Sequence, residues 1–414
     1  MKVFIVSQYF WPENFRINDL TRGLVERGHE VCVLTGTPNY PAGRFFKGYG
    51  LFQKTIDDYH GAKIIRVPIV PRGNGSEIQL ALNYFSFALI STLFAVVLSI
   101  RRFDIVFVCQ LSPVTVGIPA VILKKLTRVP IVYWILDLWP ESLSAAGAAT
   151  SKYVFSFVDR VVRFIYRGCD RILVGSKGFI PSVVSRGIEQ RRIEYFPNWY
   201  EPEYRIVQRS CRPTISRLLP SGFRVMFAGN IGVAQNFECI LNAAEKLRNH
   251  VDIHWIVLGE GRKLQWVKEE VLRRDLTTNF HMLGRYEAAE MPDFFSQADA
   301  MLVTLRRDPM FAITVPGKIQ SYMACARPVI AALDGEGVML IEEAEAGLTS
   351  PAEDSDALAA NVLRMYGMPK EDREAMGRRG RQYCEMHFDR DILIDKLDLW
   401  MKEVVIQKNI PLAR

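Results

Sequence analysis

The sequence lacks the features that mark several common classes of protein. It contains no low-complexity tract and no short repeat, which excludes disordered, fibrous and solenoid chains. Its seven cysteines are scattered, odd in number and never spaced Cys-x-x-Cys, and its six histidines form no His-Glu-x-x-His pattern. A disulfide framework and the common zinc motifs are therefore excluded, and we expect reduced thiols, a cytoplasmic protein and no metal site.

A secretion signal is also missing. The start, MKVFIVSQYF, has one lysine followed by a strand-like run that stops at Trp11-Pro12, which is too short and too polar-flanked for an exported leader. We therefore expect the protein to stay inside the cell.

Acidic residues are scarce in the first half of the chain. Residues 1–200 hold 24 Lys and Arg against 14 Asp and Glu, a net charge of +10, whereas the remainder holds 28 against 31, a net charge of −3. This asymmetry indicates that one half faces an anionic surface or substrate.

Short apolar runs rich in Val and Ile alternate with longer helical patterns along the 414 residues. Strands that are apolar on both faces and are separated by crossover helices are typical of a parallel sheet covered on both sides. The pattern stops near residues 195–204, so we expect two doubly wound α/β sheets, joined by a linker near residues 198–222, that face a cleft. The expected strands lie at residues 2–7, 30–35, 103–108, 130–135 and 171–176, and at 223–230, 252–261, 279–284, 298–304 and 327–333.

Loops after these strands carry the candidate residues, because ligands bind such sheets at the carboxyl ends of the strands. In the second half, the turn GNIG at 229–232 connects a strand to a helix and offers backbone amides to a phosphate. A Gly-x-Gly at 259–261 and Arg262 follow the next strand. Neither turn fits the dinucleotide fingerprint, since Leu264 occupies the third small position of the second one.

Residues 314–337, TVPGKIQSYMACARPVIAALDGEG, hold the most informative combination. Pro316 and Gly317 are expected to begin a helix whose N-terminal amides point to the same edge, and Lys318 adds a positive charge there. Glu336 lies between two glycines, where its carboxylate can accept sugar or ribose hydroxyls. The alternative for Lys318 is an exposed lysine at a helix start. A cation is unfavourable at that end of the helix dipole, which favours a bound anion.

The first half offers acids at strand ends. Asp137 and Glu141 follow the strand at 130–135 in the segment WILDLWPES, where an acid can orient a hydroxyl, act as a base or simply cap a helix. Glu13, Asn14 and Arg16 follow the first strand in the same way.

Two stretches admit a membrane interpretation. Ile78–Ile100 carries no charge over 23 residues, which is long enough to cross a bilayer. A span would split one sheet, so we favour a buried crossover helix and leave partial exposure at a membrane surface open. In residues 152–171 a basic helical face is either an interfacial face that binds anionic lipid, which the charge of this half favours, or an ordinary solvated face. That face comprises Arg160, Arg163, Arg167 and Arg171.

In combination, QYFWPENFRINDL, DLWPES, PNW, GNIG and VPGKIQSYMACARPVIAALDGEG resemble the motifs of the GT-B glycosyltransferases, and specifically the retaining family 4 enzymes of bacterial polysaccharide assembly. The subgroup that is most similar is the O-antigen and capsule L-fucosamine (N-acetylfucosamine) transferases, over nearly the whole chain. The resemblance implies a Rossmann-like acceptor domain at 1–200, a Rossmann-like nucleotide-sugar domain at 201–388, and a C-terminal helix, 389–414, that crosses back to the first domain.

The activity that this resemblance implies is transfer of a sugar, N-acetyl-L-fucosamine or a related 6-deoxy amino sugar, from a UDP-sugar to a saccharide linked to undecaprenyl diphosphate. The anomeric configuration would be retained, with no metal and no cofactor. The enzyme would lie at the inner face of the bacterial cytoplasmic membrane, against anionic lipid, and would bind no nucleic acid.

Carried onto this sequence, the resemblance makes Asp137, Lys318 and Glu336 the catalytic residues. The implied donor-binding residues are Gly229, Asn230, Gly232, Gln235, Gly259, Gly261, Arg262, Arg285, Gly317, Lys318, Ser321, Gly335 and Glu336. The implied acceptor-binding residues are Glu13, Asn14, Arg16, Asn39, Tyr40 and Glu141.

The chain also departs from the family pattern. Most family 4 enzymes carry two glutamates where this chain has Ile313 and Ser321, and an arginine and a lysine where it has Asn230 and Gln235. Lys318 and Arg262 are then left to meet the diphosphate.

Three other functions fit parts of the pattern. A UDP-sugar 2-epimerase with this fold would share the cleft but would need no membrane-facing half. A catalytically inactive sugar-nucleotide-binding subunit would explain the lost glutamates but not the retained Lys318 and Glu336. A nicotinamide oxidoreductase fails on both glycine turns.

Overall fold

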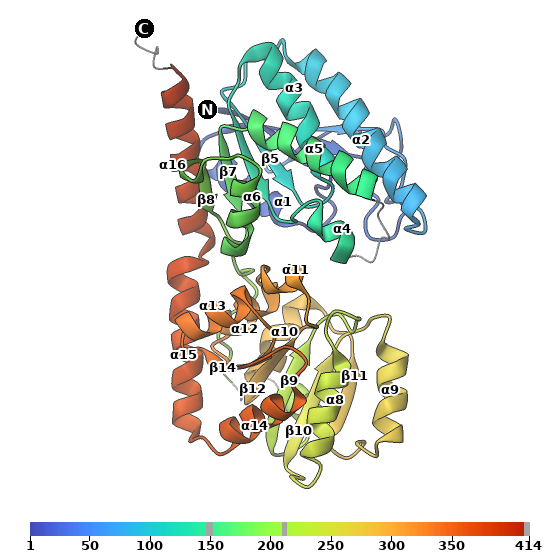
Figure 1. Cartoon of the computed structure of the whole chain (residues 1–414), viewed down its shortest axis with the longest axis vertical. Coiled ribbons are helices and arrows are strands. Elements are labelled where there is room, and N and C mark those ends of the chain that lie inside the picture. Colours follow the sequence, from blue (N-terminus) through green and yellow to red (C-terminus); the bar gives the residue numbers. More distant parts are fainter. Residues whose placement is uncertain (146–151, 209–212, 410–414) are drawn as a thin grey trace. The chain divides into compact units, whose positions relative to one another are not determined.

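The structure, a computed structural model, describes residues 1–145, 152–208 and 213–409 (Figure 1). These residues form two units, each built on one sheet with helices against it. Unit 1 comprises Met1–Pro197 and the chain from Leu393 onward, and unit 2 comprises Asn198–Ile392. The expected α/β fold with two Rossmann-like parallel sheets is confirmed.

Unit 1 contains an eight-stranded sheet in the order β3-β4-β2-β1-β5-β6-β7-β8. Neighbouring strands are parallel except for β3, which pairs antiparallel with β4 at the sheet edge. The central strands are buried on both faces, as their unbroken apolar runs predict. The strands are β1 Lys2–Val6, β2 Glu30–Gly36, β3 Ile56–Tyr59, β4 Ala62–Val67, β5 Ile105–Gln110, β6 Ile131–Ile135, β7 Arg171–Val174 and β8 Ile193–Tyr195.

Helices connect these strands, and α2, α3 and α5 lie side by side (Figure 1). The last helix, α16, packs on unit 1 from Leu393 onward: His29 Nε2 lies 2.9 Å from Asp398 Oδ1, and Arg171 Nη1 lies 2.8 Å from Glu403 Oε2. The helices are α1 Arg16–Glu26, α2 Glu77–Leu98, α3 Ile118–Thr127, α4 Glu141–Ala145, α5 Lys152–Gly168, α6 Ile180–Ser185 and α16 Arg390–Asn409, with 3-10 turns at Val114–Gly117, Lys177–Phe179 and Gln190–Arg192.

Unit 2 contains a six-stranded parallel sheet in the order β11-β10-β9-β12-β13-β14. Along β9, Val225 and Phe227 join one hydrophobic cluster and Met226 and Ala228 join another, so both faces of the sheet are covered. The strands are β9 Phe223–Ala228, β10 Ile253–Leu258, β11 Phe280–Gly284, β12 Ala300–Thr304, β13 Val329–Ala332 and β14 Gly347–Ser350.

The helices of unit 2 follow the strands in alternation, as a doubly wound fold requires. They are α7 Pro213–Leu218, α8 Phe237–Lys246, α9 Leu264–Arg273, α10 Met291–Ser296, α11 Pro309–Ala312, α12 Gly317–Ala324, α13 Glu336–Glu343, α14 Ser355–Tyr366 and α15 Lys370–His387, with a 3-10 turn at Ala288–Glu290.

Every strand that the apolar runs predict is present, and the structure adds β3, β4, β8 and β14. These four strands lie at or next to sheet edges. Their sequences are short, mixed or polar, such as IDDY in β3 and GLTS in β14, so they carry no strong apolar run.

Of two expectations about the helices of unit 1, one is confirmed in part and one is wrong. Residues 78–100 do form a crossover helix, α2, but only 28% of its most apolar stretch is buried. Within the described ranges it is the one helix long and apolar enough to cross a membrane, judged by length and composition. Arg171 does not extend the basic face of α5, because that helix ends at Gly168 and Arg171 begins β7 as a nearly buried partner of Glu403.

Candidate functional site

Two glycine turns of unit 2 meet at the carboxyl ends of β9 and β10, which are neighbours in the sheet. Gly229 has a φ of +133°, and a Cβ added to it would lie 2.7 Å from Lys318 Cε. A Cβ on Gly259 would lie 1.9 Å from the Gly229 oxygen. Glycine at both positions therefore allows the two turns and the Lys318 side chain to come together.

The turn at 229–232 is held by its own hydrogen bonds. Ile231 N donates to the Glu260 oxygen at 2.8 Å, and Gly229 N donates to the Leu258 oxygen at 2.9 Å. Gly232 N donates to Gln235 Oε1 at 3.1 Å, and Asn230 Nδ2 approaches the same oxygen at 3.4 Å. The expectation that this turn offers several free amides is wrong, because three of its four amides already have acceptors.

Helix α12 brings Lys318 to this turn. It begins at Gly317 with Pro316 as its N-cap residue, as predicted. Its Tyr322 hydroxyl donates to the Ala228 oxygen and accepts from Ala228 N, both at 3.0 Å, which fixes the helix to the end of β9. Lys318, one turn earlier on the helix, is thereby placed beside Gly229.

The Lys318 ammonium is enclosed. Nζ lies 3.6 Å from the centre of the Phe227 ring, is shielded from solvent and has no hydrogen-bond acceptor among the described residues. Burial lowers the pKa of Lys318 from 10.5 to about 7. The alternative of an exposed lysine at a helix start is therefore wrong. A buried cation without a carboxylate is costly, and an anion placed next to it would remove that cost.

Glu336 is the first residue of α13, and the glycine before it allows a close approach to the α11–α12 segment. Gly335 has a φ of +75°, and a Cβ there would lie 2.0 Å from the Ala312 oxygen. A Cβ on Gly337 would lie 3.3 Å from Pro316 Cδ. Glu336 is half-buried beside the start of α12. The hydroxyl of Ser321 donates to the Gly317 oxygen at 3.2 Å.

A cavity of about 280 Å³ adjoins the two glycine turns. Four of its lining residues, Gly229, Asn230, Gly259 and Arg285, were predicted from the sequence as donor-binding residues. The prediction missed Glu260, Tyr286 and Met291, and missed Phe227 beneath Lys318, because nothing in the local sequence marks these side chains. Arg262 is exposed and does not line this cavity, and Gly261 packs against the Ile231 oxygen.

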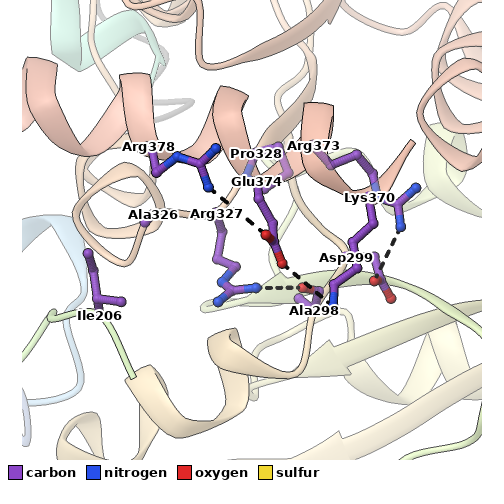
Figure 2. Close-up of a pocket in the computed structure, with 10 residues that line it drawn as sticks. All are labelled: Ile206, Ala298, Asp299, Ala326, Arg327, Pro328, Lys370, Arg373, Glu374 and Arg378. Atoms are coloured by element: carbon purple, nitrogen blue, oxygen red, sulfur yellow. Dashed lines mark hydrogen bonds and ion pairs between the residues drawn. The ribbon is translucent and has the colours of Figure 1, made fainter. Parts of the chain in front are cut away.

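A second cavity of unit 2, of about 250 Å³, lies elsewhere (Figure 2). Its residues Ala298 and Asp299 come just before β12, and Ala326 to Pro328 come just before β13, so it lies at the amino edge of the sheet. Figure 2 shows its cations turned toward Asp299, Glu374 and a backbone oxygen. Ligands of such sheets bind at the opposite edge, and none of the candidate residues lies here.

In unit 1, Asp137 follows β6 at the carboxyl edge of its sheet. Its Oδ2 accepts a hydrogen bond from Trp139 Nε1 at 3.2 Å. Burial raises the pKa of the Asp137 carboxyl from 3.8 to about 6. Glu141 is engaged differently, since Oε1 accepts from Ser182 Oγ at 2.8 Å and from Arg186 Nη2 at 2.9 Å.

The carboxylate of Glu13 fixes the loop at residues 39–40 by accepting hydrogen bonds from its backbone amides. Oε1 accepts from the backbone amides of Asn39 and Tyr40 at 2.8 and 2.7 Å, and burial raises the pKa of Glu13 from 4.5 to about 7. Asn39 is buried and accepts from Arg72 N at 3.0 Å, so both residues position the loop. Asn14 is exposed, and Arg16 begins α1.

Tyr40 belongs to a cluster of aromatic and basic side chains, of which the sequence predicted only Tyr40 itself. Its ring lies 5.8 Å from that of Tyr9 and 5.3 Å from that of Phe15. The Arg72 guanidinium lies 5.3 Å from the Tyr40 ring and donates to the Tyr9 hydroxyl. Arg72 was not foreseen because 63 residues separate it from Tyr9.

Among residues 1–145, 152–208 and 213–409, no group of three or more His, Cys, Asp or Glu side chains is placed to hold a metal ion. The six cysteines in these ranges are free and buried. The absence of a catalytic metal stays a prediction.

Two parallel sheets of this kind, with glycine turns and a buried cation at the carboxyl edge of one of them, are the fold and the kind of site expected of a GT-B glycosyltransferase. The family models agree: residues 14–199 match the glycosyl transferase 4-like domain, and residues 222–367 match glycosyl transferases group 1. The chain is a GT-B glycosyltransferase of this group.

Individual relatives support the same class. The chain is 25% identical to WcaI of Escherichia coli strain K12, named as a colanic acid biosynthesis glycosyl transferase, over 94% of this chain and 97% of WcaI. It is 27% identical to WbjE of Pseudomonas aeruginosa, named as a glycosyltransferase, over 67% of this chain and 70% of WbjE. Its fold matches that of Anabaena HepE in complex with UDP at a TM-score of 0.70 and 15% identity, over 97% and 100% of the two chains.

Proposed function

We propose that this chain is a retaining, metal-independent glycosyltransferase that moves a sugar from a UDP-sugar to a lipid-linked saccharide during synthesis of a bacterial surface polysaccharide. The naming of WcaI for colanic acid biosynthesis and the UDP bound to HepE support this choice. The observation that carries the proposal is Lys318, a buried cation with no carboxylate partner among the described residues, held beside two glycine turns.

Lys318 would meet the diphosphate of the donor. Transfer of the sugar leaves negative charge on the departing UDP, and a cation fixed at that point stabilises the transition state more than a mobile, hydrated one. The N-terminus of α12 lies at the same point and its dipole adds positive potential. Gly229 leaves space for the donor and the lysine to approach each other. Glu336 would accept hydroxyls of the sugar or the ribose.

Asp137 would act on the acceptor. A carboxyl group whose pKa lies near 6 is mostly ionised at neutral pH yet basic enough to take a proton from the attacking hydroxyl. Glu141 and Glu13 would support the acceptor surface by positioning loops, since their oxygens already accept hydrogen bonds from protein groups. Tyr40 and Arg72 would offer a ring face and a cation to the acceptor.

The donor sugar is proposed to be N-acetyl-L-fucosamine or a related 6-deoxy amino sugar, the acceptor a saccharide on undecaprenyl diphosphate, and the product an O-antigen or capsule precursor. The enzyme would lie at the inner face of the cytoplasmic membrane, where such acceptors are anchored. The basic charge of residues 1–200 is consistent with an anionic surface.

Calorimetric titration tests the proposal. The purified chain is titrated with UDP-N-acetyl-L-fucosamine, other UDP-sugars, a GDP-sugar and NADH, and UDP release is then followed after a lipid-diphosphate sugar is added. We expect binding of a UDP-sugar and acceptor-dependent release of UDP. Binding without release would favour the epimerase or the inactive subunit, and failure to bind any UDP-sugar would refute the role of Lys318.

A further inference from the structure

Helix α2 carries large apolar side chains on its exposed side as well as on its buried side. Six large apolar residues that repeat every three or four positions are between 49% and 75% exposed. They form one stripe along the helix and comprise Ile78, Leu82, Phe85, Leu89, Leu93 and Val97. The helix has 22 residues and is about 33 Å long, and the stripe from Ile78 to Val97 covers about 29 Å of it. Exposed apolar surface that is continuous over such a length marks an interaction site.

The polar side chains in the middle of α2 are buried or bonded to nearby groups. Asn83 is fully buried, where its Oδ1 accepts from Gln8 Nε2 at 2.7 Å and its Nδ2 donates to the Val70 oxygen at 2.6 Å. Ser91 is also fully buried and donates to the Phe87 oxygen. A helix at a water-exposed surface has the opposite arrangement. The outer stripe offers hydrocarbon and few hydrogen-bonding groups, which suits lipid better than the mixed surface of a protein partner.

The helix cannot cross a membrane while the sheet of unit 1 is intact. It leaves β4 and returns to β5, and both strands belong to the same sheet. A spanning helix would place these two strands on opposite sides of the bilayer. The stripe must therefore meet lipid with the helix axis along the membrane surface.

Cations cluster at one end of the stripe. Helices α2, α3 and α5 run back to the starts of the strands β5, β6 and β7, which are parallel neighbours, so the C-terminal ends of the three helices lie at the same sheet edge. The exposed cations there are Arg101, Arg102, Lys125, Arg128 and Arg167. Asp104 is an exposed acid at this edge, and it accepts a hydrogen bond from Lys2 N.

Helix α5 adds a second exposed apolar segment. At its N-terminal end Tyr153 is 88% and Phe157 is 65% exposed, and α3 packs between α5 and α2. Arg160 is exposed on the same helix, whereas Arg163 is paired with Asp159 at 2.7 Å. Aromatic residues next to cations are typical of helices at the boundary between lipid headgroups and acyl chains.

We propose that the outer stripe of α2 inserts into the headgroup–acyl boundary of an anionic membrane, with the helix parallel to the surface and its basic end held by lipid headgroups. This inference rests on the membrane location in the proposed function and deepens it, since it names the surface of unit 1 that enters the lipid. In this arrangement, contact of α2 with lipid hydrocarbon supplies most of the membrane affinity. Helix α5 and the cations at the sheet edge attract the protein to the anionic surface and orient it there.

The test is co-sedimentation of the full chain with vesicles of phosphatidylcholine alone and of phosphatidylcholine with phosphatidylglycerol, at low and high salt. The variant L89Q/L93Q/V97Q removes the C-terminal half of the stripe and keeps good helix formers. The matched control, L272Q/L399Q/I406Q, removes three side chains of similar exposure on α9 and α16. We expect the stripe variant to lose at least tenfold in partition onto the mixed vesicles at both salt concentrations, and the control to keep its partition.

Other outcomes would overturn the proposal. Equal partition of the stripe variant and the wild type would show that α2 does not enter lipid. A wild type that is dimeric without vesicles, and a stripe variant that is monomeric, would assign the stripe to a second copy of the chain. UDP-sugar binding is measured in parallel. If the stripe variant loses partition onto vesicles but still binds the UDP-sugar, the membrane surface is separate from the donor site. If the wild type binds no UDP-sugar, the proposed function is refuted instead of the membrane surface.

Discussion

If Lys318 meets the donor as proposed, donor binding should depend on pH, because the lysine's pKa of about 7 lies inside the range in which the protein can be studied. At pH 6.5 about three quarters of the unliganded protein carries the ammonium, and at pH 8.5 only about 3% does. A diphosphate that needs this charge should therefore bind about 25-fold more weakly at pH 8.5 than at pH 6.5, a difference of about 1.9 kcal/mol.

Calorimetry with a UDP-sugar measures this effect without interference from the ligand. The diphosphate of a UDP-sugar is esterified at both ends, whereas free UDP has a terminal phosphate that titrates near pH 6 and would add its own pH dependence. Titrations in two buffers with different ionisation enthalpies should show uptake of about 0.8 protons at pH 7.5.

Four variants complete the design. Lys318→Arg keeps a cation at every pH used, so its affinity should not change between pH 6.5 and pH 8.5. Lys318→Ala and Lys318→Met should bind about 1.5 to 3 kcal/mol more weakly than the wild type at pH 6.5, again without pH dependence. Lys263→Ala removes a lysine that lies 5.0 Å from the Trp266 ring and serves as the control. A 25-fold change that persists in Lys318→Met, or a wild type with constant affinity, would refute the reasoning.

The same lysine should cost stability. Its pKa falls on folding, from 10.5 to about 7, so between these values the unfolded chain binds more protons and stability rises with pH. Below pH 7 the folded protein carries the buried charge, at a cost of at most about 5 kcal/mol. Lys318→Met should therefore melt at a higher temperature than the wild type at pH 6.5, and a lower melting temperature would contradict this account.

Four further substitutions test other parts of the structure. Gly229→Ala strains a backbone with positive φ and places a methyl group against Lys318, so UDP-sugar affinity should fall at least tenfold in calorimetry. Asp137→Asn removes the candidate base and should lower kcat by a factor of roughly 100 or more with little change in donor affinity. Glu141→Gln should reduce the melting temperature by a few degrees and leave kcat within about threefold, since Glu141 is bound to Arg186. Arg274→Leu, which leaves three glutamates without their shared partner, should cost about 2 kcal/mol in urea unfolding.

The sequence predicts the sheets well because their signal is local. Runs such as IVFVCQ in β5 and IHWIVL in β10 are buried on both faces, and only a parallel strand covered by helices uses such a run over so few residues. Edge strands need less apolar surface, so IDDY in β3 carries almost none of this signal.

The candidate site was predictable in position but not in detail. A glycine turn after a strand and a lysine after Pro-Gly can be found in the sequence, and α12 begins where these residues predict. That Lys318 lies against Phe227, and that Glu141 is bound to Arg186, depends on tertiary contacts between distant residues. No local pattern distinguishes an acid that meets substrate from one that meets an arginine.

The exposed apolar side of α2 could not be predicted for a related reason. Apolar residues occur on every side of this helix, so its sequence contains no clear amphipathic pattern from which to choose the buried side. The decisive residues are Asn83 and Ser91, whose partners are side chains and carbonyls inside unit 1. Polar residues in an otherwise apolar helix are usually assigned to its exposed side, and here that assignment is wrong.

The departures of this chain from the family pattern and the chemistry of Lys318 are connected. Where the family pattern has an arginine and a lysine, this chain has Asn230 and Gln235, and Gln235 accepts hydrogen bonds within the turn instead of offering a charge to the ligand. The positive charge of the turn is thus reduced, and the enclosed ammonium beside the Phe227 ring becomes the cation that the donor would meet first. A single cation in an apolar setting interacts more strongly with a diphosphate than several hydrated cations would, because little water screens it. The same setting lowers its pKa, so an enzyme that depends on one enclosed lysine, without the arginine and the lysine of the family pattern, should bind its donor tightly only below about pH 8.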